Sequence, residues 1–66
     1  MTLTVNGAPR ELSPGATLAD LVAEMVASPQ GVAAALDGAV VPRRSWPDTT
    51  LTDGCVIEIV TAVQGG

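Results

Sequence analysis

The first part of the chain alternates polar and apolar positions with the period of a strand. Residues 2–5 follow this alternation, with Leu3 and Val5 on one face, and Asn6-Gly7 comes next. Asn-Gly beside an alternating segment favours a tight hairpin, because both turn positions need positive φ. We therefore expect a return strand over about residues 8–12, with the nitrogen of Pro9 facing away from its partner strand or lying at a bulge.

The following segment has the period of an amphipathic helix. Thr17 with Asp20 three residues later resembles a capping box and marks the start of the helix. Pro29 and Gly31 place its end within residues 28–31. Apolar residues recur at i, i+3, i+4 and i+7 and form one stripe that faces a sheet: Leu18, Leu21, Val22 and Met25.

The second half of the chain predicts another hairpin, an irregular crossover and a final strand. Residues 32–36 and 39–41 flank Asp37-Gly38, which again favours a tight reversal. Residues 42–47 read Pro-Arg-Arg-Ser-Trp-Pro and break the pattern, which indicates a short helical turn. Residues 55–63 have the length and β-branched content of a buried strand.

This order of elements predicts an α+β fold, a mixed sheet of four to five strands with one main helix packed on one face. We expect residues 1–62 to form this domain and residues 63–66 to form a tail. In the last strand, Ile57 and Ile59 should point toward the helix, whereas Glu58, Val60 and Ala62 should point away from it. No second helix is available to cover that other face, so Val60 and Ala62 are the predicted docking face for a partner.

Composition excludes several classes of function. The chain has 66 residues and a formal net charge of −4, which argues against binding nucleic acid or an anionic membrane. No apolar run approaches the roughly 20 residues of a membrane span. The chain has no His and no Lys, which removes the usual general base and a Schiff-base amine and argues against an enzyme or a metal site. One Cys excludes an internal disulfide and fits the cytoplasm.

Several side chains outside the regular pattern have a structural interpretation, and for all but Leu51 a functional one is weighed against it. Trp46 is interpreted as a lid on the core rather than an interface anchor, and Leu51 as an apolar plug beneath a polar loop. Cys55 is interpreted as a small core residue rather than a persulfide relay, since no nearby base or cation lowers its pKa. Arg43 and Arg44 fit a solvated loop pair and a site for phosphate or an acidic partner equally well.

The most informative stretch is the apolar strand that leads through Gln64 into Gly65-Gly66. Two residues without side chains make this segment thin enough to enter a narrow channel of a partner. We therefore interpret it as a presented carboxyl group, although a frayed terminus is the simpler alternative.

Five segments together carry a resemblance to a known family: Asn6, Pro14-Gly15-Ala16-Thr17-Leu18, Val41-Pro42-Arg43-Arg44-Ser45-Trp46, Asp53-Gly54 and Gly65-Gly66. The chain resembles the β-grasp fold of ubiquitin-like proteins and, more narrowly, the sulfur carrier proteins of thiamine thiazole biosynthesis. The resemblance spans the whole chain, and Val-Pro-Arg-x-x-Trp is its most specific part.

The resemblance implies a protein co-substrate that is not itself an enzyme and binds no cofactor of its own. A ubiquitin-activating-like adenylyltransferase would use ATP to convert the Gly66 carboxylate into an acyl adenylate. Sulfur drawn from cysteine through a desulfurase would then give a thiocarboxylate, which thiazole synthase would accept to form thiazole phosphate. Two alternatives stay open: a carrier for molybdopterin or cysteine biosynthesis, and an unmodified β-grasp interaction module.

Overall fold

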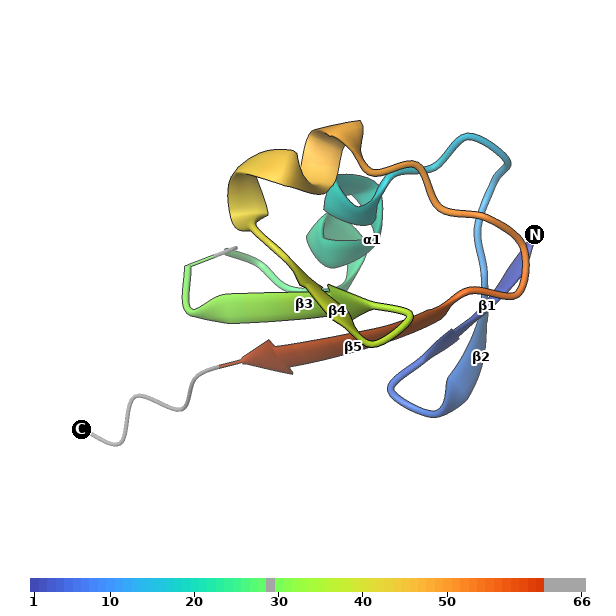
Figure 1. Ribbon diagram of the computed structural model, residues 1–66, viewed down its shortest axis with the longest axis horizontal. Coiled ribbons are helices and arrows are strands. Elements are labelled where there is room, and N and C mark those ends of the chain that lie inside the picture. Colours follow the sequence, from blue (N-terminus) through green and yellow to red (C-terminus); the bar gives the residue numbers. More distant parts are fainter. Residues whose placement is uncertain (29, 62–66) are drawn as a thin grey trace.

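A computed structural model describes residues 1–28 and 30–61 (Figure 1). Its elements are β1 (Thr2–Val5), β2 (Ala8–Glu11), α1 (Leu18–Met25), β3 (Val32–Leu36), β4 (Ala39–Val41), the 3₁₀ helix η1 (Arg43–Asp48) and β5 (Val56–Thr61). The strands form one five-stranded sheet in the order β2-β1-β5-β3-β4, and α1 and η1 lie on the same side of it. The predicted mixed sheet with one main helix on one face is confirmed.

The first hairpin forms as its turn predicts. Asn6 and Gly7 have φ values of 52° and 82°, which a two-residue turn of this kind requires. Pro9 lies opposite Thr4 on the edge strand β2. Because the Thr4 N–H donates to the Cys55 carbonyl at 3.0 Å, the paired position Pro9 directs its own nitrogen away from β1. The missing N–H of Pro9 therefore costs no ladder hydrogen bond.

Helix α1 begins at the predicted capping box. The Asp20 N–H donates to Thr17 Oγ1 at 3.2 Å, and the Thr17 N–H donates to the Asp20 carboxylate at 2.9 Å. The predicted end within residues 28–31 is wrong, because α1 ends at Met25 and Val26 is extended. A proline has no N–H for the carbonyl four residues earlier and disfavours helix at the residue before it, so Pro29 limits the helix one turn upstream of itself.

The crossover supplies the lid that the sequence predicts. Trp46 is 3% exposed, and its Nε1–H donates to the Val41 carbonyl at 2.9 Å. Leu51 is 2% exposed and fills the space beneath its loop, as expected. With the apolar stripe of α1 and the inner face of the sheet, these side chains form one core, whose most deeply buried members are Leu3, Leu18, Leu21, Val22 and Ile57.

The final strand starts one residue later than predicted. Cys55 belongs to the preceding turn, since its N–H donates to the Thr52 carbonyl at 3.2 Å, and β5 begins at Val56. Cys55 is nonetheless buried in the core, as expected. The remainder of the predicted strand, residues 62 and 63, and the predicted tail over residues 63–66 lie outside the described residues.

Candidate functional site

Strand β5 lies at the centre of the sheet, and it leads toward the predicted sulfur-carrying residues (Figure 1). On one side it pairs in parallel with β1, with Thr4 opposite Val56 and Val5 opposite Ile57. On the other side it pairs antiparallel with β3 as far as Thr61, which lies opposite Val32. Its carboxyl-terminal half therefore extends beyond the end of β1.

The side chain of Asn6 continues the ladder where β1 ends. Asn6 Oδ1 accepts a hydrogen bond from the Ile59 N–H at 2.8 Å, and its Nδ2 donates to the Ile59 carbonyl at 3.2 Å. A side-chain amide carries the same donor and acceptor as a peptide group, so it replaces the next residue of a partner strand. The sequence identified Asn6 as a turn residue and missed this contact.

Asp37 makes an equivalent contact on the opposite side of β5. Its carboxylate accepts a hydrogen bond from the Val56 N–H at 2.9 Å, and its own N–H donates to the Val56 carbonyl at 2.7 Å. Asp37 is also a turn residue, with φ of 49°. We name Asn6 and Asp37 the turn clamps: each hairpin turn holds the backbone of β5 from one side. The clamps make the segment from Val56 to Ile59 a firm base for whatever follows Thr61.

The two faces of β5 differ as predicted. Ile57 and Ile59 are 0% and 8% exposed and pack in the core, whereas Val60 is 63% exposed on the other face. Two further valines share that bare face and were missed: Val56 at 46% and Val40 at 76% exposure. The alternation of β5 could have revealed Val56, which is two positions from Glu58. We name Val40, Val56 and Val60 the valine patch.

Four predicted site residues cannot be compared with the structure. Ala62, Gln64, Gly65 and Gly66 lie outside the described residues. Within residues 1–28 and 30–61, no three potential metal ligands gather. No helix in the described part of the chain is long and apolar enough to cross a membrane.

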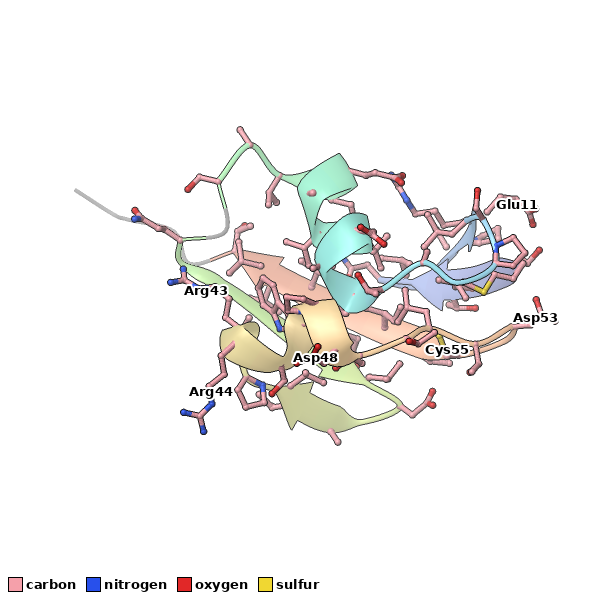
Figure 2. The ribbon with its side chains drawn as sticks, turned by 90° about the horizontal axis from the view of Figure 1, so that it is seen from above. Glu11, Arg43, Arg44, Asp48, Asp53 and Cys55 are labelled. Atoms are coloured by element: carbon pink, nitrogen blue, oxygen red, sulfur yellow. The ribbon has the colours of Figure 1, made fainter. Side chains whose placement is uncertain are left out.

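The two arginines of η1 lie at the opposite end of the molecule from two of the acidic side chains. Arg43 and Arg44 are exposed and lie at the end of the molecule toward which β5 runs, whereas Glu11 and Asp53 lie at the opposite end (Figure 2). Among the described residues, the one salt bridge joins the third arginine, Arg10, to Glu24 at 3.3 Å. Asp48 belongs to the same 3₁₀ helix, so this end of the molecule carries both arginines together with one acidic side chain.

A central strand bordered by one parallel and one antiparallel neighbour, with a single helix across one face, defines a ubiquitin-like β-grasp protein. The sequence matches the ThiS family over residues 3–66. This chain belongs to the ThiS family.

Individual relatives agree with this assignment. The sulfur carrier protein ThiS of Thermus thermophilus is 40% identical over 62 residues, which cover 94% of this chain and 95% of the relative. A crystal structure of the thiamine biosynthesis protein ThiS from Geobacter metallireducens superposes with a TM-score of 0.84 at 32% identity, covering both chains fully. A solution structure of a thiamine biosynthesis protein from the same organism gives 0.83 at 32% identity, covering 100% of this chain and 88% of the other. At this level, the chain is a sulfur carrier of thiamine biosynthesis rather than a catalyst.

Proposed function

We propose that the chain carries sulfur as a thiocarboxylate on the carboxyl group of Gly66. Membership of the ThiS family is the observation that carries this proposal. The arrangement of β5 supports it, because a strand clamped on both sides gives the residues beyond Thr61 a fixed point of departure. Each extended residue spans at most about 3.6 Å, so a few residues suffice to reach into a partner.

The chemistry requires other proteins. A carboxylate is a poor electrophile, so an adenylyltransferase of the ubiquitin-activating type first joins the Gly66 carboxylate to AMP and releases pyrophosphate from ATP. Sulfur drawn from cysteine through a desulfurase, and brought to the level of sulfide by a thiol reductant, then displaces AMP from the acyl carbon, and the carboxyl group becomes a thiocarboxylate. Thiazole synthase accepts the sulfur of the thiocarboxylate and uses it to form thiazole phosphate. The carrier provides the carboxyl group of Gly66 and presents it to the partner. ATP is bound and used by the partner.

Gln64, Gly65 and Gly66 form the presented segment in this proposal. A residue without a Cβ adds no width to the chain, so glycine at both final positions suits a narrow channel that leads to a nucleotide pocket. The single cysteine of this chain is 4% exposed and lies in the core, so the proposal assigns it no part in the transfer. We place the reactions in the cytoplasm, where thiols stay reduced.

The bare face of the sheet is the proposed docking surface for the adenylyltransferase. Val60 is 63% exposed near the end of β5, and Ala62 stands two positions later in the sequence. Val56 and Val40 extend this apolar surface around Glu58. A patch near the end of β5 would hold the carrier while Gly66 occupies the nucleotide pocket, and no nucleic acid or membrane is needed.

Intact-mass measurement tests the proposal. Co-expression with the adenylyltransferase and the sulfur source should give a species heavier by the difference between one sulfur and one oxygen atom. Gly66→Ala and Gly65→Ala should fold normally, because the described core is built from residues between Leu3 and Ile59, yet accumulate the heavier species at least about tenfold more slowly. Gly38→Ala, at a distant turn, is the matched control for the loss of a glycine and should retain the modification if the protein folds.

Three results would contradict the proposal. Unchanged thiocarboxylate yield from the Gly65→Ala and Gly66→Ala variants would show that a slender terminus is not required. A thiocarboxylate that forms but does not support thiazole formation by thiazole synthase would assign the carrier to another sulfur pathway. A chain that is never modified would instead be an interaction module.

A further inference from the structure

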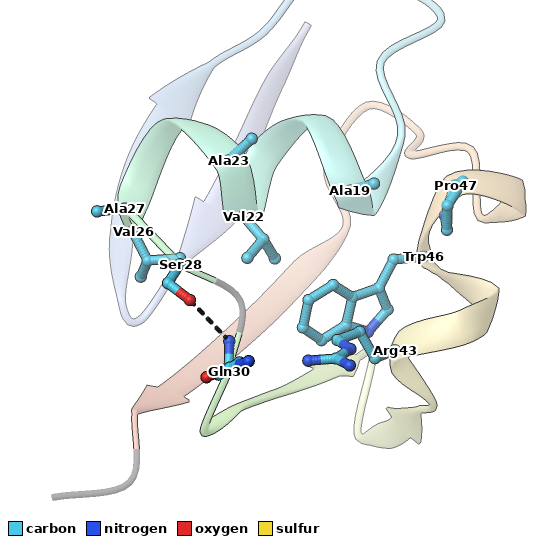
Figure 3. Close-up of a pocket in the computed structure, with 10 residues that line it drawn as sticks. All are labelled: Ala19, Val22, Ala23, Val26, Ala27, Ser28, Gln30, Arg43, Trp46 and Pro47. Atoms are coloured by element: carbon cyan, nitrogen blue, oxygen red, sulfur yellow. Dashed lines mark hydrogen bonds between the residues drawn. The ribbon is translucent and has the colours of Figure 1, made fainter.

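A groove lies on the opposite side of the molecule from the valine patch, between α1 and η1. Its volume is about 540 Å³, which lies within the range of ligand pockets. Ala19, Val22 and Val26 form its wall on the side of α1, and Trp46 forms its wall on the side of η1 (Figure 3). The early end of α1 at Met25 turns Val26 and the following residues into part of this wall. The groove is therefore apolar along most of its length.

Polar groups gather at one end of the groove. Arg43, Ser28 and Gln30 line this end, and the Arg43 guanidinium points toward Gln30 beside the indole of Trp46 (Figure 3). A 3₁₀ helix repeats every three residues, which brings Arg43 and Trp46 to the same side of η1. The Val-Pro-Arg-x-x-Trp segment thus supplies both the aromatic wall and the cation at its mouth.

Arg43 is available to an external carboxylate. Arg10 is engaged with Glu24 at 3.3 Å, whereas no described acidic side chain forms a salt bridge with Arg43 or Arg44. A planar guanidinium binds carboxylates in a bidentate manner, and a neighbouring aromatic surface orients it. An apolar groove that ends in such a cation complements a segment with an aliphatic side chain next to an acidic one.

We propose that the groove between α1 and η1 binds a segment of a partner protein in which a Glu or Asp is flanked by aliphatic residues. Small-molecule sites fix their ligands with several precisely placed polar groups, often buried. The described part of this chain has no buried polar side chain, and the polar groups of the groove lie at its exposed mouth. These features fit a peptide segment that is held by apolar side chains and oriented by one ion pair.

The position of the groove indicates that the segment comes from a protein that receives the terminal residues. Arg43 lies at the end of the molecule toward which β5 runs, so a protein that receives the terminal residues also comes close to this mouth (Figure 2). On the proposed function, on which this step rests, the segment belongs to the adenylyltransferase or to thiazole synthase. The groove then provides a second contact on the face opposite the valine patch.

Titration with a model peptide tests the groove by itself. The probe is acetyl-Leu-Glu-Leu-Leu-amide, with acetyl-Leu-Gln-Leu-Leu-amide as its neutral match. The reporter is the indole N–H of Trp46, the only tryptophan, followed by NMR on the labelled full chain. We expect the Glu peptide to shift this signal at millimolar concentration and to bind at least about threefold more tightly than the Gln peptide, as an exposed ion pair allows.

Charge reversal locates the ion pair. Arg43→Glu should remove the preference for the Glu peptide over the Gln peptide. The same peptide with Lys in place of Glu should then bind this variant more tightly than the Glu peptide. Arg44→Glu is the matched control, since Arg44 does not line the groove, and it should preserve the preference. An unmoved Trp46 signal, equal binding of the Glu and Gln peptides, or equal effects of the two arginine variants would overturn the proposal.

A second titration with the purified partners separates this inference from the proposed function. One of the two partner proteins should shift the Trp46 signal and lose at least about threefold in affinity with Arg43→Glu but not with Arg44→Glu. A carrier that forms the thiocarboxylate while neither partner moves Trp46 would overturn the assignment of the segment alone. A carrier that binds the Glu peptide but never gains sulfur would overturn the proposed function alone.

Discussion

The two faces of β5 carry similar side chains and have opposite roles. Ile57 and Ile59 point inward and are 0% and 8% exposed, whereas Val56 and Val60 point outward and are 46% and 63% exposed. All four are β-branched and favour a strand, so the backbone conformation does not depend on which face is covered. The cover differs: α1 and η1 lie over one face and neither lies over the other.

This difference shows that one strand can serve folding with its inner face and partner binding with its outer face. The inner isoleucines contribute to the free energy of folding by leaving water, while the outer valines keep their apolar surface for association. The turn clamps allow this arrangement, because Asn6 and Asp37 hold the backbone of β5 without using its side chains. Substitutions on the inner face, at a clamp and on the outer face should therefore have separable effects.

The largest effect is expected on the inner face. Ile57→Ala removes a fully buried side chain and leaves a cavity beneath α1, so it should lower the free energy of unfolding by about 2–5 kcal/mol. A protein of this size has roughly 3–10 kcal/mol of stability in total, so this loss is a large share of it. Urea denaturation followed by circular dichroism measures the change.

Val60→Ala is the matched control for this prediction. It shortens a β-branched side chain on the same strand, but at an exposed position, and should change the free energy of unfolding by no more than about 0.5 kcal/mol. Equal losses from Ile57→Ala and Val60→Ala would mean that the outer face is covered in the folded protein, and the comparison between the faces would fail.

A smaller effect is expected at the clamp on the side of β1. Asn6→Gly keeps the positive φ of the turn but removes two hydrogen bonds to Ile59, and should lower the free energy of unfolding by about 1–2 kcal/mol. Amide hydrogen exchange should show faster exchange at the Ile59 N–H than at the Val56 N–H, which Asp37 still holds.

Comparing Asn6→Ala with Asn6→Gly separates the contribution of the side-chain hydrogen bonds from that of the turn conformation. Alanine at a positive φ adds a backbone cost of about 1 kcal/mol to the loss of the same two hydrogen bonds. If Asn6→Gly is as stable as the original chain and protects Ile59 equally, the side-chain amide is not a clamp and Asn6 serves the turn alone.

Short-range patterns predicted most of the fold from the sequence. The turns at Asn6-Gly7 and Asp37-Gly38, the capping box of Thr17, and the alternation that separates Ile57 from Val60 all depend on residues within a few positions of one another. Local conformational preferences and the periods of helix and strand decide such features.

Contacts between residues far apart in the chain could not be predicted from the sequence. Asn6 and Ile59 are 53 positions apart, and the turn signal at Asn6 explains its φ without any reference to β5. The end of α1 was misplaced because a proline restricts a helix through the carbonyl four residues before it. The groove beside Trp46 depends on that early end and on the placement of η1, so it too required the structure. Local patterns predict only a presented carboxyl group at Gly66, and the prediction that this group carries sulfur comes from the family resemblance alone.

The smallest change in stability is expected on the outer face, where the change in binding should be clear. Val60→Thr preserves β-branching and strand preference, replaces one methyl with a hydroxyl in water, and should alter the free energy of unfolding by less than about 0.5 kcal/mol. If the valine patch docks the adenylyltransferase, removing apolar surface near the end of β5 should weaken the complex by about threefold or more. Isothermal titration calorimetry with the purified partner measures this affinity.

Val40→Thr, on the edge strand β4, makes the same chemical change farther from the end of β5 and should weaken binding less. Equal affinities for the original chain and both variants would mean that the exposed valines reflect strand preference alone, and the partner would then have to recognise the groove face or the terminal residues by themselves.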